Sequence, residues 1–419
     1  MNKNHNKDLR LLSLFSGCGG MDLGFEGDFN VLAQSLNEGI HPDWCELKNG
    51  RWVMVPSTRF KTVLANDIMP AARAAWVSYF GSRGNRDSDF LLESIVDLVK
   101  RHKKGEKIFP PADIVTGGFP CQDFSVAGKR NGFNSHKDHH GGLRIGDVPT
   151  DENRGKLYMW MREVIDIVRP KVFIAENVKG LVSLADAKKI IENDFRSIGD
   201  DGYLVVDAQV LFAPDYGVPQ TRERVFFLGF KKSEMTKKAI KELSKYELSA
   251  EYAPYPVKTH GTNGSGRKFY VTVKQALAGL LEPDKTNDPA QKWYSKAQWY
   301  GDHCQGQTEV DLNGLGPTIR AEHHGNIEFR RLSCAHGGRY KSELEKGLME
   351  RRLTVRECAR IQTFPDDFEF VKKANGNGYS ISSSDGYRIV GNAVPPLLAF
   401  HVAWRLQEIW PKIFKKGKS

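Results

Sequence analysis

The sequence predicts an α/β fold, in which a doubly wound, mostly parallel sheet is joined to a second, smaller domain. Short and almost entirely apolar strand patterns alternate with helix patterns over the first 230 residues, which is typical of such a sheet. Beyond Phe230 the alternation stops, and the chain becomes polar and rich in Gly, Tyr, Lys and His. A length of 419 residues accommodates two domains.

The expected elements of the first half follow one another as strand and helix. Helices are predicted over residues 71–80, with Pro70 in the first turn, and over residues 91–102 and 157–168. Apolar runs bounded by glycine, proline or polar residues predict the strands, over residues 11–15, 62–66, 114–116, 172–175, 203–211 and 225–230.

The remaining segments define the expected domains. Residues 34–61 and 134–153 interrupt the alternation, the first as an insertion and the second as a long loop. Helix patterns return over residues 354–362, where a capping box marks the start, and over residues 395–410. We therefore expect two domains, residues 1–230 plus 386–419 and residues 231–385.

The composition of the chain indicates which partners, which cellular location and which metal sites to expect. A net charge of +10 favours a polyanionic partner such as nucleic acid, although a soluble protein with surplus lysines has the same balance. No apolar run is long enough to span a bilayer, and no signal peptide is visible, so a cytoplasmic protein is expected. The six cysteines form no CxxC pair, which argues against a disulfide framework and against a structural zinc site; no metal is expected.

Cys121 is the first candidate for chemistry. It follows the predicted strand 114–116, two glycines and Pro120, at the place where open α/β sheets build their sites. A thiolate there is a candidate nucleophile. Taken alone, the cysteine fits a buried small apolar residue better.

A glycine-rich turn, Phe15-Ser-Gly-Cys-Gly-Gly20, follows the first predicted strand and lets the backbone approach a ligand closely. The third glycine of the dinucleotide fingerprint is replaced by Asp22, which disfavours NAD and favours a nucleoside without a pyrophosphate. A plain tight turn has the same pattern.

Two acidic residues end predicted strands. Asp67 follows strand 62–66 and is placed to accept ribose hydroxyls, or to cap the next helix. Glu176 follows strand 172–175 and faces the same cleft as Cys121 if the sheet is parallel. Burial would raise the pKa of its carboxyl group, so that it could donate a proton near neutral pH; helix capping is the alternative.

Paired arginines precede the last predicted strand. Arg222 and Arg224 are two residues apart, so in an extended chain they share a face that suits a base, a carboxylate or a phosphate. A solvated edge strand has the same spacing. Asn392 lies in a tight turn before the last helix, where asparagine commonly satisfies its own backbone.

In this order, these segments resemble the C5-cytosine DNA methyltransferases of prokaryotic restriction–modification systems. The resemblance covers nearly all of residues 9–230 and 351–410. The motifs that carry it are Phe-x-Gly-x-Gly-Gly, Pro-Cys-Gln, Glu-Asn-Val, Gln-x-Arg-x-Arg, Arg-Glu-Cys-Ala-Arg and Gly-Asn-x-Val. It implies the fold of the S-adenosylmethionine-dependent methyltransferases.

The resemblance also implies catalytic roles. Cys121 attacks C6 of a cytosine flipped out of the duplex, and Glu176 contacts N3 and the exocyclic amine of the base. Arg224 helps to position the cytosine, and Arg222 supports the site near Cys121. The methyl donor is S-adenosylmethionine and the product is S-adenosylhomocysteine. The cofactor contacts it implies are Phe15, Gly17, Cys18, Gly19, Gly20, Asp67, Ile68, Ser94, Ile95, Gly118, Pro120, Leu157, Asn392 and Val394.

Duplex DNA is the implied partner, and residues 231–385 are the implied target-recognition domain. Two groups of residues are candidates for DNA contact: Gln122, Ser125, Lys129, Arg130 and Arg154 toward phosphates, and Thr318, Arg320, His323, His324 and Asn326 toward base edges. A structured loop would account equally for the second group. A monomer in the prokaryotic cytosol, associated in function with a restriction endonuclease, is expected.

Two other functions compete. An RNA cytosine-5 methyltransferase has the same scaffold, although a polar segment as long as 231–350 favours duplex readout. A non-catalytic DNA-binding module is disfavoured by the presence of Cys121, Glu176 and both arginines.

Overall fold

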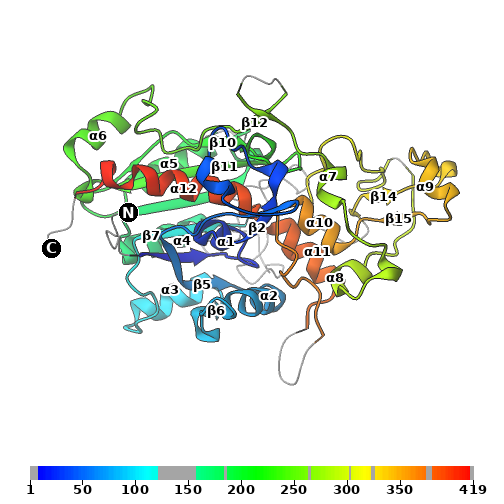
Figure 1. Ribbon diagram of the computed structural model, residues 1–419. Coiled ribbons are helices and arrows are strands. Elements are labelled where there is room, and N and C mark those ends of the chain that lie inside the picture. Colours follow the sequence, from blue (N-terminus) through cyan, green and yellow to red (C-terminus); the bar gives the residue numbers. More distant parts are fainter. Residues whose placement is uncertain are drawn as a thin grey trace.

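The computed structural model describes residues 8–120, 157–183, 186–262, 266–301, 303–321, 326–373 and 380–415. Its centre is a mostly parallel sheet with the strand order β10-β11-β8-β7-β1-β5-β6, in which β9 also pairs with β11 (Figure 1). The predicted fold class is confirmed. The strands of this sheet are β1 Leu9–Leu14, β5 Phe60–Asp67, β6 Phe90–Leu92, β7 Ile114–Gly118, β8 Val172–Val178, β9 Tyr203–Val205, β10 Gln209–Phe212 and β11 Glu223–Lys231.

The central sheet combines parallel strands with one antiparallel strand, β11. Strands β1, β5, β6, β7 and β8 pair in parallel, and helical segments lie between several of them in sequence. Strand β11 is antiparallel to β8, β9 and β10. Only residues 213–222 join β10 to β11, which is too short for a crossover helix but sufficient for an antiparallel return.

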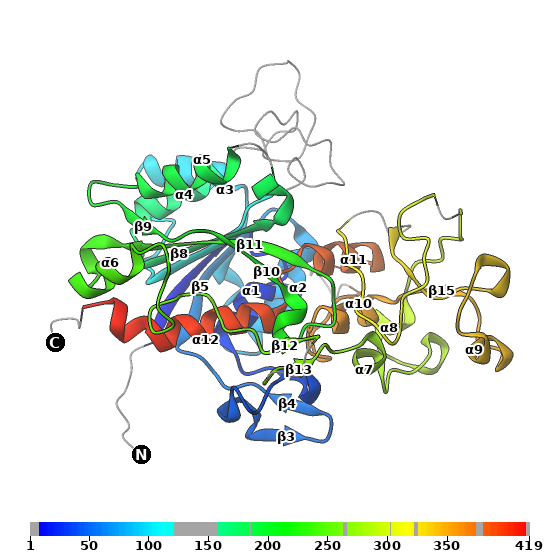
Figure 2. The same ribbon diagram turned by 90° about the horizontal axis from the view of Figure 1, so that it is seen from above.

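Helices cover both faces of the sheet, and successive strand residues alternate between the two cores. Leu11, Ile114 and Ile174 pack in the core that includes α1 and α12, whereas Leu12 and Val115 pack in the core of α3, α4 and α5. Figure 2 shows these two helix layers on opposite sides of the strands. The helices are α1 Gly20–Glu26, α2 Pro70–Gly81, α3 Ile95–Lys103, α4 Leu157–Val168, α5 Ala187–Arg196, α6 Lys237–Leu243 and α12 Pro396–Ile413.

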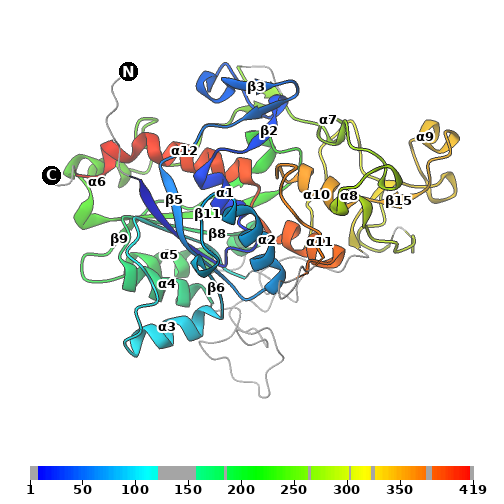
Figure 3. The same ribbon diagram turned by 60° about the horizontal axis from the view of Figure 1, so that its bottom comes forward.

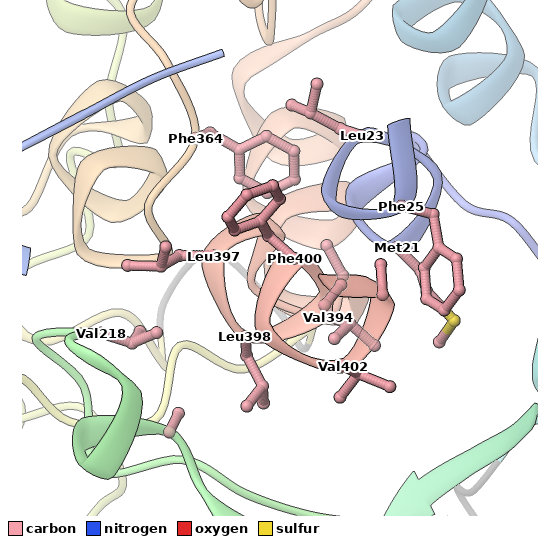
Figure 4. Packing of buried hydrophobic residues seen from close by; sticks show 14 of the residues in the cluster. Met21, Leu23, Phe25, Val218, Phe364, Val394, Leu397, Leu398, Phe400 and Val402 are labelled. Atoms are coloured by element: carbon pink, nitrogen blue, oxygen red, sulfur yellow. The ribbon is translucent and has the colours of Figure 1, made fainter. Parts of the chain in front are cut away.

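The last helix packs closely on the first. A methyl group at Gly24 of α1 would lie 2.4 Å from the carbonyl oxygen of Pro396 and 2.5 Å from Cβ of Ala399, so a larger residue would separate the two helices. Apolar side chains such as Phe25 and Phe400 fill the surrounding space (Figure 4). The C-terminal helix therefore belongs to the same packed unit as the N-terminal strand.

Short elements with little regular sheet lie beside this unit (Figures 1 and 3). Ion pairs of buried arginines join several of them: Arg331 lies 2.7 Å from the partly exposed Glu282, and Arg351 lies 2.9 Å from the buried Glu357. Polar contacts thus supplement a limited apolar core. The elements are β12 His260–Gly261, β13 Lys268–Phe269, α7 Val273–Leu277, α8 Pro289–Lys292, β14 Phe329–Arg331, α9 Lys341–Glu345, β15 Arg351–Arg352, α10 Val355–Ile361 and α11 Ser383–Asn392.

The insertion at residues 34–61 contributes most of a small antiparallel sheet, formed by β2 Asn30–Leu32, β3 Leu47–Asn49 and β4 Trp52–Met54. The buried Asn37 amide donates to the carbonyl groups of Thr259, at 2.9 Å, and Gly266, at 3.2 Å. Arg51 donates to carbonyl groups at both Gln275 and Ala278. The sequence offered no role for this segment, which braces the short elements against the main sheet.

Two element predictions were wrong in detail. Residues 91–92 belong to strand β6, because the chain there pairs with the end of β5 and the Asn66 amide donates to the carbonyl groups of Leu91 and Glu93. Helix α3 begins only at Ile95. The strand expected over residues 203–211 is divided into β9 and β10.

In the part of the chain that the structure describes, no helix combines the length and apolarity needed to cross a bilayer.

Candidate active site

The candidate site lies at the carboxyl ends of the parallel strands β1, β5, β7 and β8. Strands β7 and β8 are in a register that places Gly118 opposite Glu176. A methyl group at Gly118 would lie 2.9 Å from Oε2 of Glu176, so glycine leaves the space in front of this carboxylate open. Strand β7 leads through Phe119 to Pro120. Cys121, the next residue, lies outside the described residues.

Glu176 is a buried carboxylate that forms an ion pair with Arg224. Its residue is only 7% exposed, and Oε1 lies 3.0 Å from Nε of Arg224 on β11. Desolvation raises the pKa of the carboxyl group, and the charges of Arg224 and Arg222 only partly oppose this effect. Within the described residues Oε1 accepts no hydrogen bond despite the ion pair. The carboxyl group therefore retains hydrogen-bonding capacity for a ligand.

Arg222 contacts a different part of the chain from Arg224. Its side chain is fully buried, and the guanidinium group donates to the carbonyl groups of Ile319 at 3.0 Å, and of Gly391 and Ala393, both at 2.8 Å. The guanidinium group thus joins the start of β11 to two distant segments. The two-residue spacing predicted a shared face for Arg222 and Arg224, but the hydrogen bonds of Arg222 and the ion pair of Arg224 go to different groups.

The glycine-rich turn is tied to Asp67. One carboxylate oxygen of Asp67 accepts the backbone N–H of Gly17 at 2.9 Å, and the other accepts that of Met69, also at 2.9 Å. Helix α2 has Met69 as its N-cap residue, so Asp67 closes a local turn before the helix rather than capping it. Gly17 has φ +57°, and among the described residues no atom lies within 4 Å of the position that a side chain would occupy. The turn and the end of β5 therefore lie together at one edge of the sheet.

The next three residues of the turn face the protein interior. A methyl group at Gly19 would lie 2.5 Å from the Phe80 ring, and one at Gly20 would lie 2.4 Å from the Val394 carbonyl oxygen. Cys18 is fully buried. Internal packing accounts for these small residues independently of any ligand.

Asp22 supports the glycine-rich turn in a way that the sequence did not reveal. It is fully buried and accepts hydrogen bonds from Ser13 at 2.5 Å, from Ser16 at 2.6 Å and from the Trp76 indole at 2.8 Å. The sequence showed Asp22 only as a break in the glycine pattern. Ser13 and Ser16 could have indicated the role of Asp22, because they place two hydroxyl donors close to the start of the helix that contains it. These bonds fasten the glycine-rich turn to β1 and α2.

The other expected cofactor residues differ in exposure. Ile68 is 42% exposed, and the exposed Asn392 lies with Nδ2 3.9 Å from the sulfur atom of Met69. These two side chains are accessible beside the turn. Ser94, Ile95, Leu157 and Val394 are buried, and Phe15 packs partly buried against the same core as Ile95 and Leu157.

The residues expected to contact DNA are described only in part. Thr318 donates to the carbonyl group of Thr221, and Arg320 donates to the Glu328 carboxylate at 2.8 Å and to the Asn326 carbonyl group at 3.4 Å. The Thr318 contact joins this residue to the chain just before β11, and the Arg320 contacts join it to residues 326 and 328. Gln122, Ser125, Lys129, Arg130, Arg154, His323 and His324 lie outside the described residues. No group of three or more potential metal ligands occurs in the described ranges.

Comparison with known proteins adds a family and a fold. A family model described as C-5 cytosine-specific DNA methylase matches residues 9–408. The Type II methyltransferase M.BspRI of Lysinibacillus sphaericus is 31% identical over 406 residues, which cover 94% of this chain and 80% of the relative. The Type II methyltransferase M.BsuRI of Bacillus subtilis is 30% identical over 409 residues, with coverages of 94% and 78%.

Two solved structures share the fold at low identity. The S. pombe Dnmt2 methyltransferase has a TM-score of 0.52 and 17% identity, and covers 95% of this chain and 98% of its own. The Entamoeba histolytica methyltransferase EhMeth has a TM-score of 0.54 and 13% identity, with coverages of 97% and 99%.

Replacing Asp22 should change the pH dependence of stability. Burial raises the pKa of Asp22 to about 6, so between pH 4 and pH 6 the folded state binds a proton that the unfolded chain has released. As the pH rises from 4 to 6, the unfolding free energy of the native protein should therefore decrease by up to about 3 kcal/mol relative to that of Asp22→Asn. Urea unfolding of both proteins at several pH values measures this difference. A difference that does not change with pH would contradict the assignment.

Proposed function

Because the chain belongs to the C-5 cytosine-specific DNA methylase family, we propose that it methylates C5 of a cytosine flipped out of a specific duplex DNA sequence. The enzyme class, DNA cytosine-5 methyltransferase, follows from that membership. The observation that carries the proposed chemistry is the buried Glu176–Arg224 pair, which faces Gly118 on the strand leading to Cys121.

Cys121 is the proposed nucleophile. C5 of cytosine is a weak nucleophile, so addition of a thiolate at C6 is a reasonable way to activate it. The thiolate forms a bond to C6, electron density moves to C5, and C5 takes the methyl group. Loss of the C5 proton then restores the double bond and expels the thiolate. Since C5 and C6 lie within the duplex stack, the base must be flipped out before this reaction.

Glu176 is the proposed acid for N3 of the cytosine. Its raised pKa favours the protonated form, which donates to N3 as negative charge develops in the ring. The other carboxyl oxygen accepts from the exocyclic amine. Arg224 orients the carboxyl group through the 3.0 Å ion pair and is the residue proposed to contact the base beside it.

The residues around the glycine-rich turn fit S-adenosylmethionine. The Asp67 carboxylate accepts backbone N–H groups, among them those of Gly17 and Met69, and its two oxygens have acceptor capacity beyond these bonds for ribose hydroxyls. Ile68 exposes an apolar surface suited to adenine, and no described atom lies within 4 Å of the side-chain position of Gly17. Asn392 is accessible on the opposing turn. When bound, S-adenosylmethionine supplies the methyl group and leaves as S-adenosylhomocysteine.

Residues 231–385 are the proposed target-recognition domain, and residues 1–230 plus 386–419 the catalytic and cofactor-binding domain. The net charge of +10 suits a DNA partner. Relatives named Type II methyltransferases support a role in protecting host DNA from a restriction endonuclease. We further propose that the enzyme acts as a monomer in the prokaryotic cytosol.

Cys121→Ser should abolish methyl transfer, because a serine hydroxyl does not ionise enough to add to C6. Transfer of tritiated methyl groups to plasmid DNA measures the loss. Cys334→Ser is the matched control, since Cys334 is an exposed cysteine outside the proposed catalytic and cofactor-binding domain, and it should retain methyl transfer.

Two results would contradict this assignment. Full activity of Cys121→Ser would exclude the nucleophile, and methyl transfer to transfer RNA rather than to duplex DNA would favour the RNA methyltransferase alternative. Bisulfite sequencing of plasmid from cells that express the native enzyme identifies the modified cytosine and its flanking sequence.

Glu176→Gln should lower kcat by about 10²- to 10⁴-fold with little change in DNA affinity, because the amide cannot supply a proton to N3. Single-turnover methylation with a defined duplex separates chemistry from binding. Glu192→Gln is the control, as Glu192 is also buried and paired with an arginine, at 3.1 Å, but lies on α5. Equal rates for Glu176→Gln and the native enzyme would remove Glu176 from the mechanism.

A further inference from the structure

An aromatic side chain holds the insertion at residues 34–61 against α12. Trp44 is 1% exposed, and its ring centroid lies 4.7 Å from that of Phe400 and 4.7 Å from that of His401. The His41 ring stacks on the Trp44 ring, with centroids 3.8 Å apart and 3° between the planes. Figures 2 and 3 show the insertion beside α12, on the face of the main sheet opposite α4 and α5. Trp44 thus anchors the insertion on α12.

Three histidines surround this contact. His41 belongs to the insertion, His401 to α12 and His260 to β12. The centroid of the His401 ring lies 5.9 Å from that of His41 and 5.3 Å from that of Tyr216. Nε2 of His260 lies 3.0 Å from the carbonyl oxygen of Gln34, at the start of the insertion. Each histidine therefore takes part in holding the insertion, and we call the three of them the histidine cluster.

His401 is a buried ring that does not accommodate a charge. It is 2% exposed, and within the described residues neither ring nitrogen makes a hydrogen bond of ordinary geometry. A neutral imidazole has one N–H donor, whereas the protonated ring has two donors and a positive charge. The charged groups that act on His401 are the other two histidines, which would repel a proton there. Protonation of the docked cluster is therefore costly, because a buried charge needs a partner of opposite sign.

Burial lowers the pKa of all three histidines, most strongly that of His401. The other two histidines lower the pKa of His401 further, and the carbonyl group of Tyr216 opposes this effect. A released insertion returns the rings to water, where the pKa of histidine is about 6.5. The released state therefore gains protons as the pH falls below about 7, and the docked state does not. The charged groups that act on the other two histidines are Asp43 and Glu408, at His41, and Asp215 and Lys268, at His260.

We propose that the histidine cluster is an acid-sensitive switch that releases residues 34–54 from α12 while the main sheet stays folded. These residues form no strand of the main sheet, and α12 is also packed on α1 through Gly24. Asn37 and Arg51 join the same insertion to residues 259–266 and to α7. Its release therefore also frees the short elements that it braces.

Hydrogen exchange of the native enzyme between pH 7 and pH 5 tests the proposal. After correction for the intrinsic pH dependence of exchange, the opening constant at residues 41–45 should rise at least about 20-fold, the change expected when one histidine gains a proton on release. The opening constant at α7 should rise in parallel, because the same insertion braces that helix. The opening constant of β8 should not rise.

His401→Phe removes the titratable ring and keeps an aromatic contact with Trp44. The variant should lower the pH-induced rise at residues 41–45 by about 20-fold. His336→Phe is the matched control, because His336 also stacks on a tryptophan, Trp299, with centroids 4.4 Å apart. It lies outside the cluster and forms an ion pair with Glu350 at 2.7 Å. This control should retain the native pH dependence at residues 41–45.

Three results would overturn the inference: an opening constant at residues 41–45 that is equal at pH 7 and pH 5, a pH dependence that His401→Phe leaves unchanged or that His336→Phe also removes, or opening of β8 together with the insertion. Should His401→Phe fail to fold, NMR titration of the imidazole groups in the native enzyme decides. His401 should stay neutral until the insertion opens, and protonation of His401 while residues 41–45 remain protected would overturn the inference. Methyl transfer enters none of these measurements, so the proposed function is tested separately.

Discussion

The parallel pairing of β7 with β8 is the constraint on which the site depends. Because Gly118 lies opposite Glu176, the strand that leads to Cys121 ends beside the carboxylate, and glycine leaves the space between them open. Arg224, on the antiparallel strand β11, provides the positive charge that orients the Glu176 carboxylate. A one-residue change of register would turn Glu176 to the other face of the sheet. The proposed chemistry therefore follows from a backbone arrangement more than from any single side chain.

Buried polar groups, rather than apolar packing alone, connect this site to the rest of the molecule. Asp22 fastens the glycine-rich turn through three donors, and Arg222 joins β11 to Ile319 and the turn at residues 391–393. Such groups are costly to bury unless all of their hydrogen bonds are made, so each fixes its segments in one arrangement. This explains how elements with little regular structure can be placed accurately beside the sheet.

The sequence predicted the sheet and the edge that bears the site, because apolar strand runs and strand-end residues such as Glu176 have strong local signals. It did not predict that Arg222 contacts three carbonyl groups, since its partners lie about 100 to 170 residues away in sequence. Asp22 was missed for the same reason, because Trp76 joins its site only through the fold. Residues 91–92 were assigned to a helix because a short apolar run does not distinguish helix from strand.

The central claim is that Cys121 adds to C6 of a cytosine seated against Glu176. A duplex with 5-fluorocytosine at the target position tests it most directly, because fluorine replaces the proton that must leave C5 for the enzyme to be released. The account predicts a 1:1 covalent complex that forms only with S-adenosylmethionine, and mass spectrometry should locate the nucleotide on Cys121. Release of the enzyme without an adduct, or an adduct on another residue, would contradict the account.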